Sequence, residues 1–257
     1  MEENLMTAEK YLAHCYEVPE NLPKLPLEDE KFLAKWSECQ GNAAIHLLEN
    51  LYKNKLTLRE GVKISFTQTL AGKLPVVDTY NHEDFTTLAS FLTNRTERKI
   101  LPVTVNAFTL PPKIDGEYHK IILLNRAPYS NVPAEKLSLT AEEWLEKSHK
   151  IRLRHESAHY ETLRLFGGMK NHALDEILAD TLGQIAAFGN FSASRQKLFF
   201  GLNGDKCNGR LTFYCQKVLP NERHKIYSVV DNFLDKMEVS GKSDIEILCL
   251  LAGQSLA

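Results

Sequence analysis

Residues 154–180, RHESAHYETLRLFGGMKNHALDEILAD, constrain the fold more than any other stretch of this chain. His155 and His159 are four residues apart, so on a helix both imidazoles lie on one face, one turn from each other. Gly167 and Gly168 are placed to end that helix, because a residue without Cβ accepts the left-handed conformation after a helix C-terminus. The pattern predicts a helix, a glycine turn and a second helix.

The second helix carries two carboxylates with the same spacing, Glu176 and Asp180, and Asn171 can cap its start. At 1.5 Å per residue, His159 lies about 10 Å and His155 about 16 Å before the end of the first helix. Glu176 lies about 8 Å and Asp180 about 14 Å beyond the start of the second, by the same rise. In an antiparallel hairpin, Glu176 is therefore level with His159, and Asp180 with His155.

These residue types at this spacing are those of a metal site. Catalytic zinc usually takes three protein ligands, and Glu176 can supply the third beside the two histidines. Glu156 is adjacent to the metal-binding face, where a carboxylate can take a proton from water. The alternative for the first helix is a solvated face with polar contacts between turns. For Glu176 it is an acid favoured by the helix dipole, and Glu161, His172 and Asp175 are nearby rivals as the third ligand.

The segments His155-Glu156-Ser-Ala-His159 and Glu176-Ile-Leu-Ala-Asp180 resemble the HExxH and ExxxD motifs of gluzincins, the thermolysin-like zinc metallopeptidases. The resemblance covers residues 152–182. It implies one Zn²⁺ per chain with three ligands, His155, His159 and Glu176. It also implies that Glu156 is the general base and that Asp180 orients His155. The implied substrate is a peptide or protein, cleaved at a peptide or amide bond.

A hydrolase of this kind also needs a donor for the oxyanion that forms when water attacks a carbonyl. His224 and Tyr227 are three residues apart on one predicted helix face and are candidates, although a surface histidine and a half-buried tyrosine are the alternative. Arg210 and Tyr214 are comparable candidates. VNAF, residues 105–108, is similar to the Asn-Ala-Phe substrate-binding edge strand of thermolysin-like enzymes.

Three other interpretations compete with a gluzincin. The metzincin pattern HExxHxxGxxH fails, because it needs glycine at Thr162 and histidine at Leu165. The Glu-x-x-His pairs at 146–149 and 156–159 fit a di-iron bundle poorly, since such pairs belong on different helices. A non-catalytic, metal-stabilised binding or regulatory protein remains open. In such a protein, a fourth protein ligand such as His172 or a cysteine would complete the coordination of the metal.

Composition restricts the surroundings in which such a site works. The net charge of -2 argues against a nucleic-acid or anionic-membrane surface, both of which attract clustered lysine and arginine. The acidic start MEENLMTAEK lacks a signal-peptide pattern, and no apolar run is long enough to span a bilayer. Five cysteines without CxxC spacing suit a reducing compartment. We expect a cytoplasmic protein.

Hydrophobic periodicity predicts an α+β fold with a small mixed or antiparallel sheet. The resemblance to gluzincins implies that this fold is zincin-like. The expected N-terminal lobe, residues 1–166, ends in the HExxH helix, and a helical lobe, residues 167–257, follows, unless both form one compact domain. The strand at 119–130 is expected to form the sheet edge beside the cleft. The other expected elements are strands at 62–70, 100–110 and 119–127, helices at 82–94, 210–219, 221–237 and 243–256, and a Thr140–Glu143 capping box.

Overall fold

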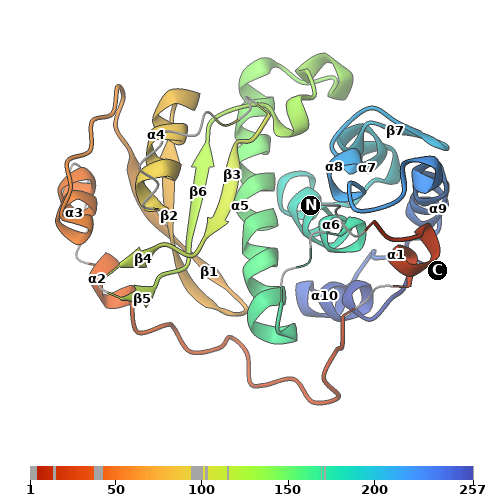
Figure 1. The fold of residues 1–257 in the computed structure, drawn as a ribbon, viewed down its shortest axis with the longest axis horizontal. Helices are drawn as coiled ribbons and strands as arrows, with labels where there is room; N and C mark the ends of the chain where they lie inside the picture. Colours follow the sequence, from red (N-terminus) through yellow and green to blue (C-terminus); the bar gives the residue numbers. More distant parts are fainter. Residues whose placement is uncertain are drawn as a thin grey trace.

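The computed structural model describes residues 5–13, 16–37, 43–93, 101, 104–114, 116–168, 170 and 172–256, without the side chains of 43, 44 and 52. A four-stranded sheet lies on one side of the long helix α5, and shorter helices lie on the other (Figure 1). The α-helices are α1 (Ala8–Leu12), α2 (Leu33–Ser37), α3 (Ala43–Tyr52), α4 (His82–Leu92), α5 (Ala141–Phe166), α6 (Ala173–Phe188), α7 (Ala193–Phe200), α8 (Leu211–Tyr214), α9 (Arg223–Lys236) and α10 (Asp244–Ala252). The 3-10 turns of the described residues are η1 (Tyr129–Asn131), η2 (Ala134–Leu137) and η3 (Pro220–Glu222).

The sheet is small and mixed, and the prediction of a mixed α/β chain with such a sheet is confirmed. Its order is β1 (Lys63–Thr69), β2 (Gly72–Thr79), β6 (Ile121–Asn125) and β3 (Ala107–Leu110). β1 and β2 are antiparallel, β2 and β6 are parallel, and β6 and β3 are antiparallel. Two short hairpins lie outside it: β4 (Lys113–Ile114) with β5 (Glu117–Tyr118), and β7 (Leu202–Asn203) with β8 (Lys206–Cys207).

Strand β2 was not among the predicted strands, and Pro75 lies in the middle of it. A proline cannot donate to a β-ladder, which argues against a strand flanked on both sides. In the structure, the parallel ladder between β2 and β6 begins at Val76, one residue after the proline. That ladder therefore does not need the N–H that Pro75 lacks, and the proline is tolerated in a strand with a neighbour on each side.

The prediction that the strand at 119–130 forms the sheet edge is wrong. β6 lies between β2 and β3, and all five of its residues are buried. A short run of apolar residues is what a strand buried on both faces requires. The edge strand beside the site is β3, which contains Ala107 and Phe108 of the VNAF segment.

The helical side of the molecule includes residues from the beginning of the chain. α1 packs with α9, and Ala8, Tyr11 and Leu12 join a core cluster otherwise made by residues after 172. Both ends of the chain therefore lie on this side, and residues 16–32 connect it to α2 on the sheet side (Figure 1). The expected division at residue 166 does not separate α1 from the later helices. Within the described ranges, no helix combines the length and apolarity needed to cross a membrane.

Helices α5 and α6 approach each other closely at Gly183. A Cβ at this position would lie 2.9 Å from the carbonyl oxygen of Ile151 and 3.0 Å from its side chain. Ile151 lies one turn before His155, and Gly183 lies one turn after Asp180, so this contact holds the two functional faces together. The glycine is therefore a spacing residue of the candidate site.

We expect Gly183→Ala to destabilise the protein by about 1–2 kcal/mol, because overpacking outweighs the gain in helix propensity. Urea unfolding of the metal-free protein measures this. Gly168→Ala is the matched control, because its Cβ would meet only the end of the Lys170 side chain at 3.7 Å. An unchanged or higher free energy of unfolding for Gly183→Ala contradicts the spacing role.

Candidate metal centre

Helix α5 begins and ends as the sequence predicts. Glu143 N–H donates to Thr140 Oγ1 at 3.3 Å, and the Glu143 carboxylate accepts from Thr140 N–H at 2.9 Å. The helix ends at Gly167 with a φ of 76°. This fixes where the histidines of α5 lie relative to the turn that follows.

Helix α6 begins after His172, whose Nδ1 accepts a hydrogen bond from Leu174 N–H at 3.1 Å. The predicted cap, Asn171, lies outside the described residues. Asp175 and Glu176 are in the first turn, where the helix dipole favours acids. The first carboxylates of α6 therefore lie in its first turn, shortly after the chain leaves α5.

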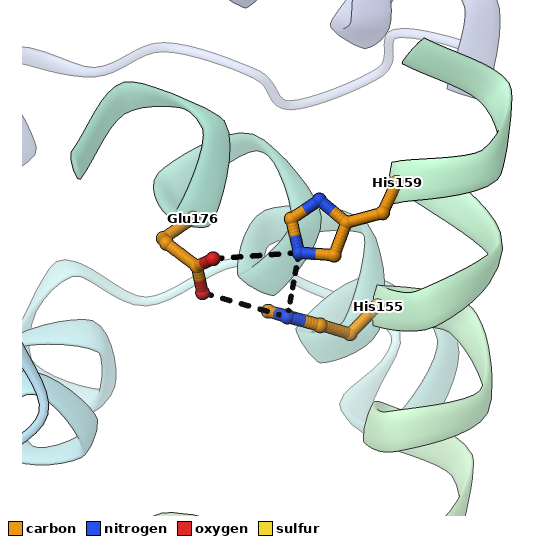
Figure 2. Close-up of side chains that lie close together, drawn as sticks. All are labelled: His155, His159 and Glu176. Atoms are coloured by element: carbon orange, nitrogen blue, oxygen red, sulfur yellow. Dashed lines mark hydrogen bonds and ion pairs between the residues drawn. The ribbon is translucent and has the colours of Figure 1, made fainter. Parts of the chain in front are cut away.

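The structure brings His155, His159 and Glu176 together (Figure 2). The two Nε2 atoms of the histidines are 3.0 Å apart. Glu176 places Oε2 3.5 Å from His155 Nε2 and Oε1 3.4 Å from His159 Nε2. The side chains of His155, His159 and Glu176 are 8%, 12% and 7% exposed, which shields them from bulk water.

The outer nitrogens of both rings face carboxylates, so in the neutral rings the protons belong on Nδ1. His155 Nδ1 lies 2.8 Å from Asp180 Oδ1, and His159 Nδ1 lies 3.3 Å from Asp175 Oδ2. Both Nε2 lone pairs then point into the space that the Glu176 carboxylate also faces. With both rings neutral, three acceptors converge there, and a bound cation would satisfy them all.

The dimensions of the cluster suit a metal ion. Tetrahedral zinc with bonds of about 2.0–2.1 Å separates its ligand atoms by about 3.3 Å, close to the distances between these three groups. Glu176 Oε2 is moreover buried and accepts no hydrogen bond from any described residue. Two imidazoles and one carboxylate could therefore hold a metal ion here.

Asp180 is hydrogen-bonded from several directions. Its Oδ1 accepts from His155 and from the Tyr129 hydroxyl, and its Oδ2 accepts from Gln196 at 2.6 Å and from Arg210. Burial alone would raise the pKa of Asp180, but the charge of Arg210 and the hydrogen bond from His155 hold it well below its usual range. Asp180 stays ionised and fixes the ring of His155.

Asp175 lies beside His159 Nδ1 in a similar way, but at 3.3 Å it forms an ion pair outside hydrogen-bond geometry. Its other oxygen accepts from the Tyr16 hydroxyl at 2.6 Å, and Oδ2 accepts from Lys170 N–H at 2.9 Å. Burial lowers the pKa of His159, but the nearby carboxylates of Asp175 and Glu176 outweigh it and raise this pKa well above its ordinary value. Each histidine therefore has its own orienting acid.

Glu156 lies next to the cluster without joining it. Thr109 of β3 donates from Oγ1 to Glu156 Oε2 at 2.8 Å, and the side chain is 7% exposed. This bond ties the edge strand to the candidate base. It also leaves the second carboxylate oxygen, Oε1, for a proton from water.

A cavity of about 840 Å³ opens beside the three candidate ligands and Glu156. One wall comes from residues around β3 and another from residues around α8. The lining residues are Thr104–Thr109, Tyr129–Asn131, Arg152, His155, Glu156, His159, Lys170, Asp175, Glu176, Asn208–Arg210 and Thr212–Tyr214. The cluster therefore has room for a substrate next to it.

The structure places neither His224 nor Tyr227 at this cavity. His224 is exposed on α9, and Tyr227 is 8% exposed within a core cluster that contains Leu211 and Cys215. Arg210 and Tyr214 do line the cavity. They lie there because the chain turns back after β8, a connection that helical spacing on α9 cannot reveal.

The chain belongs to a family of unknown function (DUF7005), whose pattern matches residues 112–240. The matched region includes α5, α6 and α8, and so every candidate ligand and both orienting acids. No curated protein and no solved structure matches the chain.

We expect Asp180→Asn to weaken zinc affinity by about 10–100-fold, because the His155 ring loses its charged partner. Competition with a chromophoric chelator measures this. Asp84→Asn is the control, since Asp84 is also buried but caps the N–H groups of Arg59 and Glu60 in the sheet half. The orienting role is refuted by equal zinc affinities in the two variants.

The charge of Glu176 stabilises the metal-free fold. Burial raises its pKa, but the hydrogen bond from His159 and the charges of His159, His155 and Arg210 lower it to about 2 from an ordinary 4.5. A carboxylate with a depressed folded pKa contributes stability above its unfolded pKa and loses that contribution as pH falls towards the folded value. The contribution is about 3 kcal/mol at neutral pH.

We therefore expect the stability advantage of the metal-free parent over Glu176→Gln to shrink by about 2 kcal/mol between pH 6 and pH 3. Urea unfolding at intervals of half a pH unit follows this change. Parallel stability profiles for the two proteins would show that the carboxylate is not stabilised by its neighbours.

Proposed function

We propose that this protein is a zinc-dependent hydrolase with a zincin-like fold, a metallopeptidase of gluzincin type that cleaves peptide bonds. The observation that carries the proposal is the convergence of His155, His159 and Glu176 beside a cavity large enough for a peptide segment. Glu156 lines the same cavity, so a candidate base and three candidate ligands face one space.

The number of converging ligands supports a catalytic centre over a structural one. A structural zinc site is closed by four protein ligands, whereas a catalytic site keeps a position open. Among the described residues, the cluster has three members and no cysteine. His172 is occupied elsewhere, since its Nε2 lies 2.9 Å from the Tyr11 carbonyl oxygen and Nδ1 caps α6.

His155, His159 and Glu176 would hold the zinc ion, which would supply a lowered pKa for bound water and polarisation of the scissile carbonyl. Glu156 takes the proton of the attacking water on Oε1, while Thr109 holds Oε2 in place. The same carboxyl then delivers the proton to the leaving amine. With the metal bound, the carboxylates of Asp180 and Asp175 next to the two Nδ1 atoms would favour the tautomer with Nε2 unprotonated in both rings.

Tyr214 is the donor that we assign to the developing oxyanion, and it replaces His224 and Tyr227 in this proposal. Its side chain lines the cavity. Burial raises the pKa of Tyr214 well above its ordinary value, and so do the charge of the Glu176 carboxylate and the hydrogen bond that the phenol donates to it. The phenol therefore keeps its proton at neutral pH and can donate a hydrogen bond to the substrate.

A peptide in extended form suits the edge of the sheet. Residues 104–109 line the cavity, and β3 is the edge strand there. Backbone groups on such an edge can pair with an added strand. The Thr109–Glu156 bond holds that edge next to the proposed base.

We expect Glu156→Gln to keep zinc and thermal stability but to lose about 10²–10⁴-fold in peptide hydrolysis, because only the proton acceptor is removed. His159→Ala should lose zinc and activity together. Elemental analysis of protein purified without chelator and cleavage of a peptide mixture, followed by mass spectrometry, measure both quantities.

Glu146→Gln is the matched control, an exposed position on α5 that receives the same chemical change. It should keep both zinc and activity. Absence of zinc from the parent protein, even after titration, would exclude the proposal. Full hydrolysis by Glu156→Gln would place the activity elsewhere, and zinc binding without hydrolysis in the parent would favour a metal-stabilised regulatory protein.

A further inference from the structure

Arg152 is a buried cation in the wall of the cavity, and it is 4% exposed. No described carboxylate lies within ion-pair distance of its guanidinium. Arg210, in the same cavity, differs in this respect because it is paired with Asp180. The Glu156 carboxylate acts on Arg152 from beyond that distance, so the buried guanidinium has no direct counter-ion, and an anionic ligand would supply one.

The hydrogen bonds of Arg152 do not neutralise it. Nη1 donates to the carbonyl oxygen of Ala127, and Nη2 donates to that of Pro128 at 2.7 Å. A guanidinium has five N–H donors, so these two bonds leave others for a ligand. Burial lowers the pKa of Arg152 to about 10, which still leaves it charged at neutral pH.

The turn that Arg152 holds carries backbone strain beside the cavity. Ser130 and Asn131 have φ values of 51° and 56°, in the left-handed region that costs a non-glycine residue about 1–2 kcal/mol. Both line the cavity. The Ser130 Oγ is buried and has no hydrogen-bond partner among the described residues. The turn thus brings a residue with an unsatisfied hydroxyl to the same cavity as the buried guanidinium, and this combination indicates a binding function.

The cavity wall that contains Arg152 lies close to the candidate metal ligands. The Arg152 guanidinium is 5.6 Å from the centre of the Tyr129 ring, and the Tyr129 hydroxyl is 3.1 Å from His155 Nδ1. One aromatic ring therefore separates Arg152 from a candidate zinc ligand. An extended peptide advances about 3.3 Å per residue, so a group bound here belongs to a residue near the scissile bond.

We propose that Arg152 and Ser130 form a carboxylate-binding subsite that makes this hydrolase prefer substrates with a carboxylate near the scissile bond. The inference rests on the proposed function and deepens it. A planar guanidinium matches a carboxylate with paired hydrogen bonds, and the Ser130 hydroxyl adds a further donor. The carboxylate is either that of an acidic side chain or the free C-terminus of a short peptide.

Matched peptides test the subsite in the zinc-loaded protein. The parent should cleave a peptide with glutamate near the scissile bond with a kcat/KM about 10–100-fold higher than its glutamine counterpart. Peptides with free and amidated C-termini, compared in the same way, distinguish the two sources of the carboxylate. No preference in either comparison overturns the proposal.

Arg152→Gln keeps donors for the two carbonyls but removes the charge, so the preference ratio should fall to about 1. Ser130→Ala should reduce it by only a few-fold. Arg126→Gln is the control, because Arg126 pairs with the exposed Glu142 on the surface and should keep the parental ratio. An equal loss on both peptides in Arg152→Gln, with the ratio unchanged, would mean that Arg152 only supports the turn.

Binding to the Glu156→Gln protein separates this inference from the proposed activity. The acidic peptide, or the one with a free C-terminus, should bind about 10–100-fold more tightly than its neutral counterpart, as titration calorimetry measures. If the parent cleaves nothing but this preference exists, the proposed function fails and the subsite stands. Equal affinity, or no measurable affinity for any peptide, overturns the subsite.

Discussion

The buried carboxylate of Asp180 is the interaction on which the rest of the site depends. It is fully buried and accepts hydrogen bonds from His155, Tyr129, Gln196 and Arg210. These donors come from α5, η1, α7 and the start of α8, so one charge joins four parts of the chain. Because an uncompensated carboxylate at this depth is strongly unfavourable, those parts must assemble together. The ring of His155 is therefore positioned by the same contacts that close the helical side of the molecule.

Much of the candidate centre could be predicted from sequence, because it is made by local geometry. His155 and His159 share a face of α5, and the glycine turn at Gly167 returns the chain so that α6 presents its acids at matching heights. Helical rise alone predicts which acid lies beside which histidine, and the measured distances agree. What local geometry did not provide was the role of Asp175, since its neighbour Glu176 has the same charge and nearly the same height.

The remaining contributors lie far away in sequence and follow no period. Tyr129 precedes α5, and Gln196 and Arg210 follow α6, so only the complete fold brings them to Asp180. The same limit explains the errors in the sheet. A run of apolar residues such as 121–125 shows that a strand is buried, but not which strands flank it. Residue spacing also predicted that His224 and Tyr227 share a helix face, but it did not indicate which part of the core that face packs against.

Arg210 can reach Asp180 because two glycines allow the chain to fold back. A Cβ on Gly201, whose φ is 68°, would lie 2.6 Å from the Cα of Gly209, and a Cβ on Gly209 would lie 2.6 Å from the carbonyl oxygen of Phe200. This contact lets the segment after β8 lie against the end of α7, with Arg210 5.1 Å from the centre of the Tyr129 ring. The candidate ligands thus depend on one helix pair, whereas the cavity walls at 104–109, 129–131 and 208–214 come from separate segments. Residues that would recognise a substrate can therefore change without altering the spacing that would hold the metal.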